Sequence, residues 1–208
     1  MDVRLDNSIG LAMYENLGMI EQKPIGVGLV ISDDLRQATT EVVAGNIRFK
    51  MAVGEALASR LMYALVLQFD RVQLLDHPVF GIEGLSPAAG LNTFLFVNLK
   101  HLDSIVSISP RLNAVATESS GWIEIEAQLE DRRGGFIWEG TGSTEAEATQ
   151  ESIGFAGGQD ASIAMNRAIE IMVAKLVAQM SMSDSLHDFI DEVEPYGSLQ
   201  FLSVGKSL

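Results

Sequence analysis

A strict two-residue alternation between Trp122 and Asp131 is the sequence feature that most constrains the fold. Four apolar side chains alternate with four polar ones, namely Ile123, Ile125, Ala127 and Leu129 against Glu124, Glu126, Gln128 and Glu130. Because successive side chains of a strand point to opposite faces of a sheet, the pattern predicts a strand with one buried and one solvent-facing side. Such one-sided burial is typical of an antiparallel sheet.

The residues that follow predict a hairpin. Arg132, Arg133, Gly134 and Gly135 connect the alternating strand to a second β-prone segment at 135–140. Glycine adopts the positive φ angles of tight hairpin turns at little cost. The two arginines are therefore expected to be solvated at the hairpin tip, with contact to an anionic partner as the alternative.

Short β-branched or alternating runs predict further strands at 25–32, 39–43, 72–75, 93–99, 105–109 and 113–116. The alternating strand itself is expected to span 121–130. Gly45 and Asn46 mark a turn after the second of these runs. Glycine, proline and small polar residues predict loops at 78–90 and 141–158.

Apolar residues at three- and four-residue spacing predict two long helices, at 49–69 and 161–182. The stripe of the first helix consists of Val53, Leu57, Leu61, Ala64 and Leu65. Glu55, Ser59 and Arg60 are expected on its wetter side. A short helix is expected from Ser183 to a point before Pro195, since proline disfavours helical backbone in the residue before it.

These elements predict one α+β domain, a two-layer sandwich in which a mostly antiparallel sheet carries the two long helices on one face. The domain is expected to span 25–194, with an N-terminal arm at 1–24 and a C-terminal tail at 195–208. A length of 208 residues is enough for one substantial core. Exposed edge strands of such a sheet give a route to a homo-oligomer.

Composition argues against several classes of function. The formal net charge of −14 argues against a nucleic-acid partner, because phosphate binding requires a basic surface. The absence of cysteine excludes disulfides and thiolate chemistry. No apolar run has the length of a membrane-spanning helix, and the first residues show no export signal. The protein is expected to be cytoplasmic if Met1 is the native start.

The sequence gives little evidence for reactive groups. Glu124, Glu126 and Glu130 share one strand face and could bind a cation or act as acids and bases, although a solvated face explains them better. The histidines His77, His101 and His187 are not at metal-ligand spacing. We therefore expect no catalytic, cofactor-binding or metal-binding residues.

Other motifs are equally unspecific. Residues 119–121 are expected to form a turn, and the glycine-rich stretches match no phosphate-binding motif. Met165, Met172, Met180 and Met182 could line an apolar groove, although core packing is the simpler interpretation.

The stretch AMNRAIEIMVAKLVAQMSMSDSLHDFI at 164–190 is similar to the C-terminal end of YajG-like lipoproteins, in which a long helix runs into a short D-S-hydrophobic-H-E/D-F-I segment. That segment is represented by residues 184–190. The order of elements over 25–190 also resembles periplasmic domains related to the TolB amino-terminal domain, and auxiliary lipoproteins of lipid transport systems. In these families the mature chain begins at a lipidated cysteine, which this sequence lacks.

The resemblance implies a non-catalytic, periplasmic domain, anchored to the outer membrane once a signal and lipobox have been removed, that works in envelope interaction or assembly through its surface. The expected partner is an envelope protein. The alternative is a carrier that holds lipid or another apolar ligand between sheet and helices. An enzyme is the least favoured class, because no concave group of reactive residues can be assembled from the sequence.

Overall fold

The computed structural model describes residues 2–3, 5, 22–44, 46–76, 90–110, 115–152 and 157–197. Most of the predicted arm at 1–24 and nearly all of the predicted loop at 78–90 lie outside these ranges. The same holds for the tail beyond residue 197.

Within the described ranges, the main sheet has five strands in the order β5-β2-β6-β7-β8. These are β2 (Lys23–Ile31), β5 (Phe69–Leu75), β6 (Thr93–Pro110), β7 (Val115–Asp131) and β8 (Phe136–Ser152). The last three are antiparallel neighbours, whereas β2 is parallel to both β5 and β6. The sheet is therefore mixed: the long ladders of β6, β7 and β8 are antiparallel as expected, and β2 adds the shorter parallel ones. A long connection containing a helix returns the chain to the same end of the sheet before β5, which is the requirement for a parallel pair.

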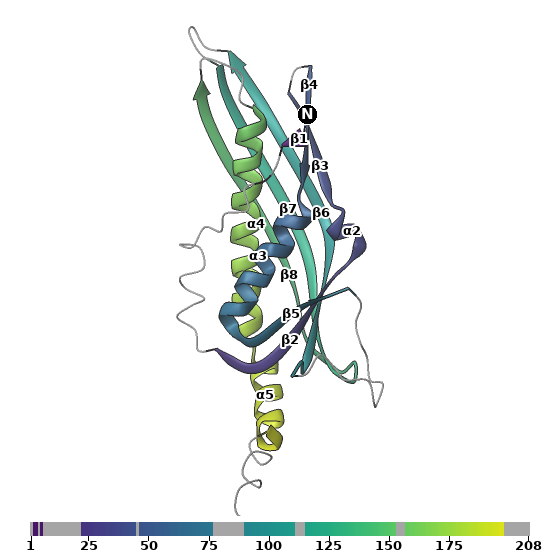
Figure 1. Ribbon diagram of the computed structural model, residues 1–208. Coiled ribbons are helices and arrows are strands. Elements are labelled where there is room, and N and C mark those ends of the chain that lie inside the picture. The colour runs from purple at the N-terminus through teal and green to yellow at the C-terminus, as the bar shows by residue number, and fades with distance from the viewer. Residues whose placement is uncertain are drawn as a thin grey trace, which may run out of the picture.

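Two long helices lie side by side on one face of this sheet (Figure 1). They are α3 (Gly54–Gln68) and α4 (Gly157–Ser181), and one buried apolar cluster joins them to the strands. The four apolar residues of the alternating segment in β7 are fully buried beneath them. A third helix, α5 (Asp184–Gly197), follows α4 and continues past Pro195, so its predicted end is too early.

A second, smaller sheet adjoins the helix side. It consists of β1 (Asp2–Val3), β4 (Ile47–Ala52) and β3 (Thr39–Ala44). The one-turn helix α2 (Asp33–Arg36) connects β2 to β3. The predicted helix at 49–69 is thus wrong over its first five residues. Phe49 and Met51 are buried while Arg48 and Lys50 are exposed, so the two-residue period of a strand governs this segment.

The long strands also correct the sequence analysis. Segments predicted as separate strands at 93–99 and 105–109 form one continuous β6, and the predicted turn at 119–121 lies within β7. The predicted loop at 141–158 is largely β8, in which exposed glutamates alternate with small inward residues such as Thr144 and Ala146. Small and polar residues are also typical of loops, so the sequence of this segment did not indicate a strand.

Arg60 is the clearest error in the helix prediction. It was expected on the wet side of α3 but is 1% exposed and points toward α4. Its Nη2 atom donates a 2.8 Å hydrogen bond to Asn166 Oδ1, and its Nε atom lies 3.6 Å from a carboxylate oxygen of Glu170. A buried charge needs such partners, so Arg60 fixes the position of α3 against α4.

Gly121 permits the close approach of α4 to β7. A Cβ atom added there would lie 2.8 Å from the Cα and 2.9 Å from the backbone nitrogen of Met165. Those are backbone atoms of the helix, which cannot yield by a change of rotamer. Any side chain at this position would push α4 away from the sheet.

We therefore expect Gly121→Ala to lower the free energy of unfolding by about 3 kcal/mol, the upper part of the usual range for overpacking. Gly142→Ala in β8 is the matched control. Its added Cβ would meet the Sδ atom of Met172 at 3.0 Å, and a flexible thioether can move aside. Urea denaturation measures both variants. Equal losses would contradict the role assigned to Gly121.

Candidate functional site

The two histidines that the structure describes have different neighbours. His101 packs against the ring of Trp122 with 4.1 Å between ring centroids, whereas His187 Nε2 lies 2.8 Å from Lys23 Nζ where α5 meets β2. His77 lies outside the described residues. Across the described parts of the chain, no three His, Cys, Asp or Glu side chains are grouped closely enough to hold a metal ion.

The glutamates of β7 lie on the sheet face opposite the helices. Glu126 forms a 2.7 Å salt bridge with Lys100, and Glu130 accepts a 2.9 Å hydrogen bond from Gln128. Glu124 is opposite Ser143 of β8. The three carboxylates thus belong to an outward-facing polar surface, in agreement with the simpler of the two interpretations.

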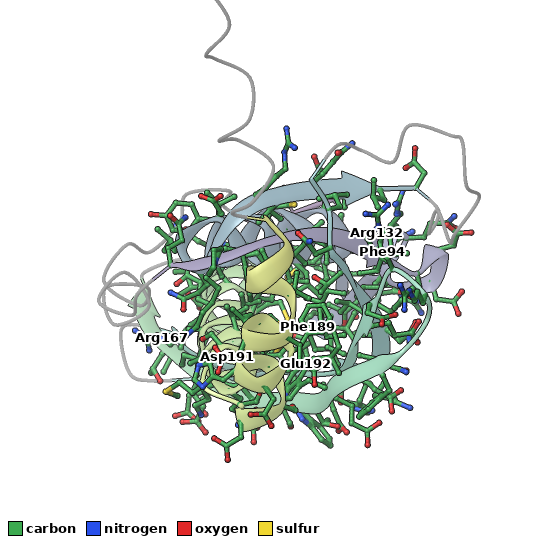
Figure 2. All side chains as sticks on the ribbon, turned by 90° about the horizontal axis from the view of Figure 1, so that it is seen from below. Phe94, Arg132, Arg167, Phe189, Asp191 and Glu192 are labelled. Carbon is green, nitrogen blue, oxygen red and sulfur yellow. The ribbon has the colours of Figure 1, made fainter. Side chains whose placement is uncertain are left out.

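The predicted hairpin tip is present between β7 and β8. Backbone amides of Arg133 and Gly135 both donate to Asp131 Oδ1 at 2.7 Å, and Gly134 has a φ of 79°. Arg132 and Arg133 are exposed. Arg132 lies on the side of the molecule away from Arg167 (Figure 2).

Three of the four methionines pack in the core. Met165, Met172 and Met180 are at most 1% exposed, whereas Met182 is exposed beyond the end of α4. This agrees with core packing rather than with an apolar groove.

The two edges of the main sheet differ. On the outer strand β5, side chains occupy carbonyl groups at both ends: Gln22 Nε2 donates to Phe69 O at 3.1 Å and Arg36 Nη2 to Leu75 O at 2.8 Å. On the other side, β8 pairs with β7 and has no further strand beside it among the described residues. Both β5 and β8 are outer strands of this sheet, but β8 has 17 residues and β5 has seven, so β8 is the longer edge.

Two hydrogen bonds establish which backbone groups of β8 face this edge. Arg167 Nη1 donates to the carbonyl of Glu147 at 3.3 Å, from outside the sheet. The residue opposite Glu147 is Ser120, whose own carbonyl accepts a bond from Ser104 of β6 and so points away from β8. Since backbone direction alternates along a strand, the N–H and C=O groups of Glu145, Glu147 and Thr149 point outward.

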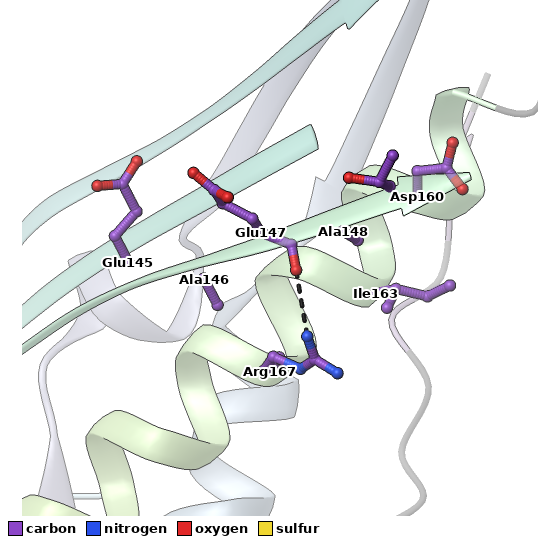
Figure 3. A pocket seen from close by; sticks show the side chains of 8 residues that line it. Glu145, Ala146, Glu147, Ala148, Asp160, Ile163 and Arg167 are labelled. Atoms are coloured by element: carbon purple, nitrogen blue, oxygen red, sulfur yellow. Dashed lines mark hydrogen bonds between the residues drawn. The ribbon is translucent and has the colours of Figure 1, made fainter. Parts of the chain in front are cut away.

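A pocket of about 780 Å³ lies along this edge, between β8 and the first turns of α4. Its lining comprises Glu145, Ala146, Glu147, Ala148, Thr149, Asp160, Ile163 and Arg167. Figure 3 shows Glu145 and Asp160 at opposite ends, with the Arg167 bond to the Glu147 main chain between them. The β8 wall facing α4 is made of alanines, which leaves space beside the helix.

Asp160 is the buried charge of this pocket. It is 1% exposed, and its Oδ2 atom accepts a hydrogen bond from the hydroxyl of Thr117. Its Oδ1 atom has no hydrogen-bond partner among the described residues, and neither has the hydroxyl of Ser119 nearby on β7. Burial of a carboxylate is costly, so the hydrogen bond from Thr117 stabilises Asp160 in this position.

Four charged residues line this pocket: Glu145 and Glu147 from β8, and Asp160 and Arg167 from α4. The two residues on α4 were not among the candidates predicted from the sequence. A lone arginine on the polar side of an amphipathic helix carries no signal until the strand beside it is known. The misassigned loop at 141–158 concealed that strand.

Comparisons with known proteins add structural likenesses only. No protein-family model matches the sequence, and no curated protein is significantly similar to it. A solved structure from Helicobacter pylori, described as a neuraminyllactose-binding hemagglutinin homolog, has 12% identity and a TM-score of 0.45. The match covers 93% of this chain and 99% of that one.

Two other similar structures are described as lipoproteins. A minor lipoprotein from Acinetobacter baumannii has 15% identity and a TM-score of 0.36, covering 74% of this chain and 91% of its own. A protein from Caulobacter crescentus has 15% identity and a TM-score of 0.34, covering 76% and 92%. These TM-scores are too low for any inference about function.

In the described part of the chain, no helix combines the length and the apolar character that crossing a bilayer requires.

A double-mutant cycle tests the Thr117–Asp160 contact. We expect Thr117→Val, which preserves side-chain shape, to lower the free energy of unfolding by about 2 kcal/mol, because it leaves a buried carboxylate without its hydroxyl donor. In an Asp160→Ala background the same substitution should cost close to nothing. Urea denaturation of the four proteins gives the coupling, and equal effects in both backgrounds would refute it.

Amide exchange tests whether the β8 edge is open. We expect fast hydrogen–deuterium exchange at Glu145, Glu147 and Thr149, whose amides face outward, and slow exchange at Thr144 and Ala146, which face β7. NMR resolves the individual amides. Protection at both sets would mean that another segment covers the edge.

Proposed function

We propose that this chain is a non-catalytic domain of a periplasmic, outer-membrane lipoprotein that binds an envelope protein along the edge of β8. One observation carries the proposal: β8 is a 17-residue outer strand whose outward backbone groups border a pocket. Unpaired strand edges are templates for binding another extended segment.

The lipoprotein assignment rests on the sequence resemblance. The matched segment 184–190 forms the first half of α5, directly after the long α4, which is the order of elements in the YajG-like chains. The helices on one face of a mixed sheet also support a TolB amino-terminal-domain-like sandwich.

The contacts within the pocket support a binding role. Arg167 is engaged with a backbone carbonyl and Asp160 with Thr117, so both charged groups that reach in from α4 have structural partners. No nucleophile lies against a base among the eight lining residues. Carriage of an apolar ligand has no comparable support, because the methionines that would line such a cavity are packed in the core.

Photo-crosslinking in cells tests the proposal. A crosslinking residue in place of Thr149 at the β8 edge should yield a specific adduct in the envelope fraction, identified by mass spectrometry. The same residue in place of the exposed Asp70 on β5 is the matched control and should not. Adducts of equal yield at both edges, or recovery of the protein outside the envelope, would contradict it.

A further inference from the structure

We propose that the partner segment at the β8 edge is a basic, extended peptide, with lysine or arginine alternating with apolar residues, that joins the sheet as a sixth strand. This inference rests on the proposed function and specifies the chemistry of the partner.

The hydrogen-bonding geometry of β8 allows its edge to pair with an added strand. Outward N–H and C=O groups recur at every second residue along Glu145, Glu147 and Thr149, the spacing that an added strand matches with its own backbone. The carbonyl of Glu147 is engaged by Arg167 through a 3.3 Å bond from an exposed side chain. An incoming backbone amide can take the place of this bond.

Charge selects the partner. The β8 side chains on the face away from the helices include the exposed Glu139, Glu145 and Glu147, and β7 adds Glu118 to the same face. Side chains of an added strand would lie beside them at cross-strand distance, where opposite charges stabilise pairing and like charges oppose it. Basic residues on that face of the peptide satisfy this requirement.

The same charges disfavour a second copy of this chain. Two β8 strands paired edge to edge would place glutamates beside glutamates, in molecules that each carry a formal charge of −14. Among the residues that line the pocket at this edge, Arg167 is the single cation, against the carboxylates of Glu145, Glu147 and Asp160. The predicted homo-oligomer by edge strands is therefore not the occupant that the charges favour.

The pocket accommodates the other face of the peptide. Every second side chain of an added strand would point toward α4, into the space bordered by Ala146, Ala148 and Ile163. These neighbours are small or apolar, so they suit modest apolar side chains.

The test uses a synthetic heptapeptide, Lys-Val-Lys-Thr-Lys-Val-Lys with blocked ends, and a matched peptide with glutamate for every lysine. Fluorescence anisotropy of the labelled peptides measures affinity for the full chain. We expect the lysine peptide to bind at least tenfold more tightly, and to slow exchange of the amides of Glu145, Glu147 and Thr149. Equal affinity of the two peptides, or protection of other amides, would overturn the proposal.

Variants localise the effect. Reversing the charge at the edge with Glu145→Lys and Glu147→Lys together should weaken binding of the lysine peptide about tenfold. This fold-change corresponds to about 1.4 kcal/mol of binding free energy. The control combines Glu55→Lys and Asp70→Lys, which change the net charge equally at sites remote from β8, and should retain most of the affinity. Equal weakening by both pairs would mean unspecific attraction and would overturn the proposal.

Two backbone-directed variants complete the design. Glu147→Pro removes one outward N–H group without removing a bond to β7, and should weaken binding. Arg167→Met frees the Glu147 carbonyl and removes a cation, so it should strengthen binding a fewfold. If Arg167→Met does not raise the affinity for the lysine peptide, the assigned docking geometry is overturned. This result does not depend on the stability of the proline variant.

Sedimentation of the chain tests the remaining possible occupant of the β8 edge, which is a second copy of the same chain. A dimer that Glu147→Pro dissociates would identify a second copy as the occupant and overturn the proposal. If edge crosslinks form in cells while the lysine peptide fails to bind, only the basic chemistry is refuted. If the peptide binds but no edge crosslink forms in the envelope, the proposed function is refuted as well.

Discussion

The close contact of α4 with β7 and β8 is the constraint on which the structure depends. Alternation in β7 provides a continuous apolar face, and Gly121 allows the helix backbone to come nearer than any side chain would permit. This contact sets the depth of the core and draws α3 into place through the buried Arg60 contacts with Asn166 and Glu170. It also places the first turns of α4 beside the outer strand, where the pocket lies.

The sequence predicted the elements whose periodicity was strong. The β7 segment, the hairpin at 132–135 and the helix at 161–182 agree with the structure because each has a clear apolar face of one period. The prediction failed where two periods met or where the buried residues were small. Residues 49–53 were included in the predicted helix at 49–69, and Thr144 and Ala146 were too small to indicate the inner face of β8.

Tertiary partners account for the remaining differences. Nothing near Arg60 in the sequence indicates burial, because its partners lie more than a hundred residues away on α4. The parallel pairing of β2 depends in the same way on where the intervening helix returns the chain. The candidate site could not be predicted from the sequence, because Asp160 and Arg167 of α4 form a pocket only with β8, a strand whose sequence resembles a loop.

The unequal length of the two outer strands has a consequence for assembly. β8 has 17 residues, whereas β5 at the other side of the sheet has seven. An extended segment can therefore form more backbone hydrogen bonds along β8 than along β5, so the two sides of the sheet do not compete equally for the same segment.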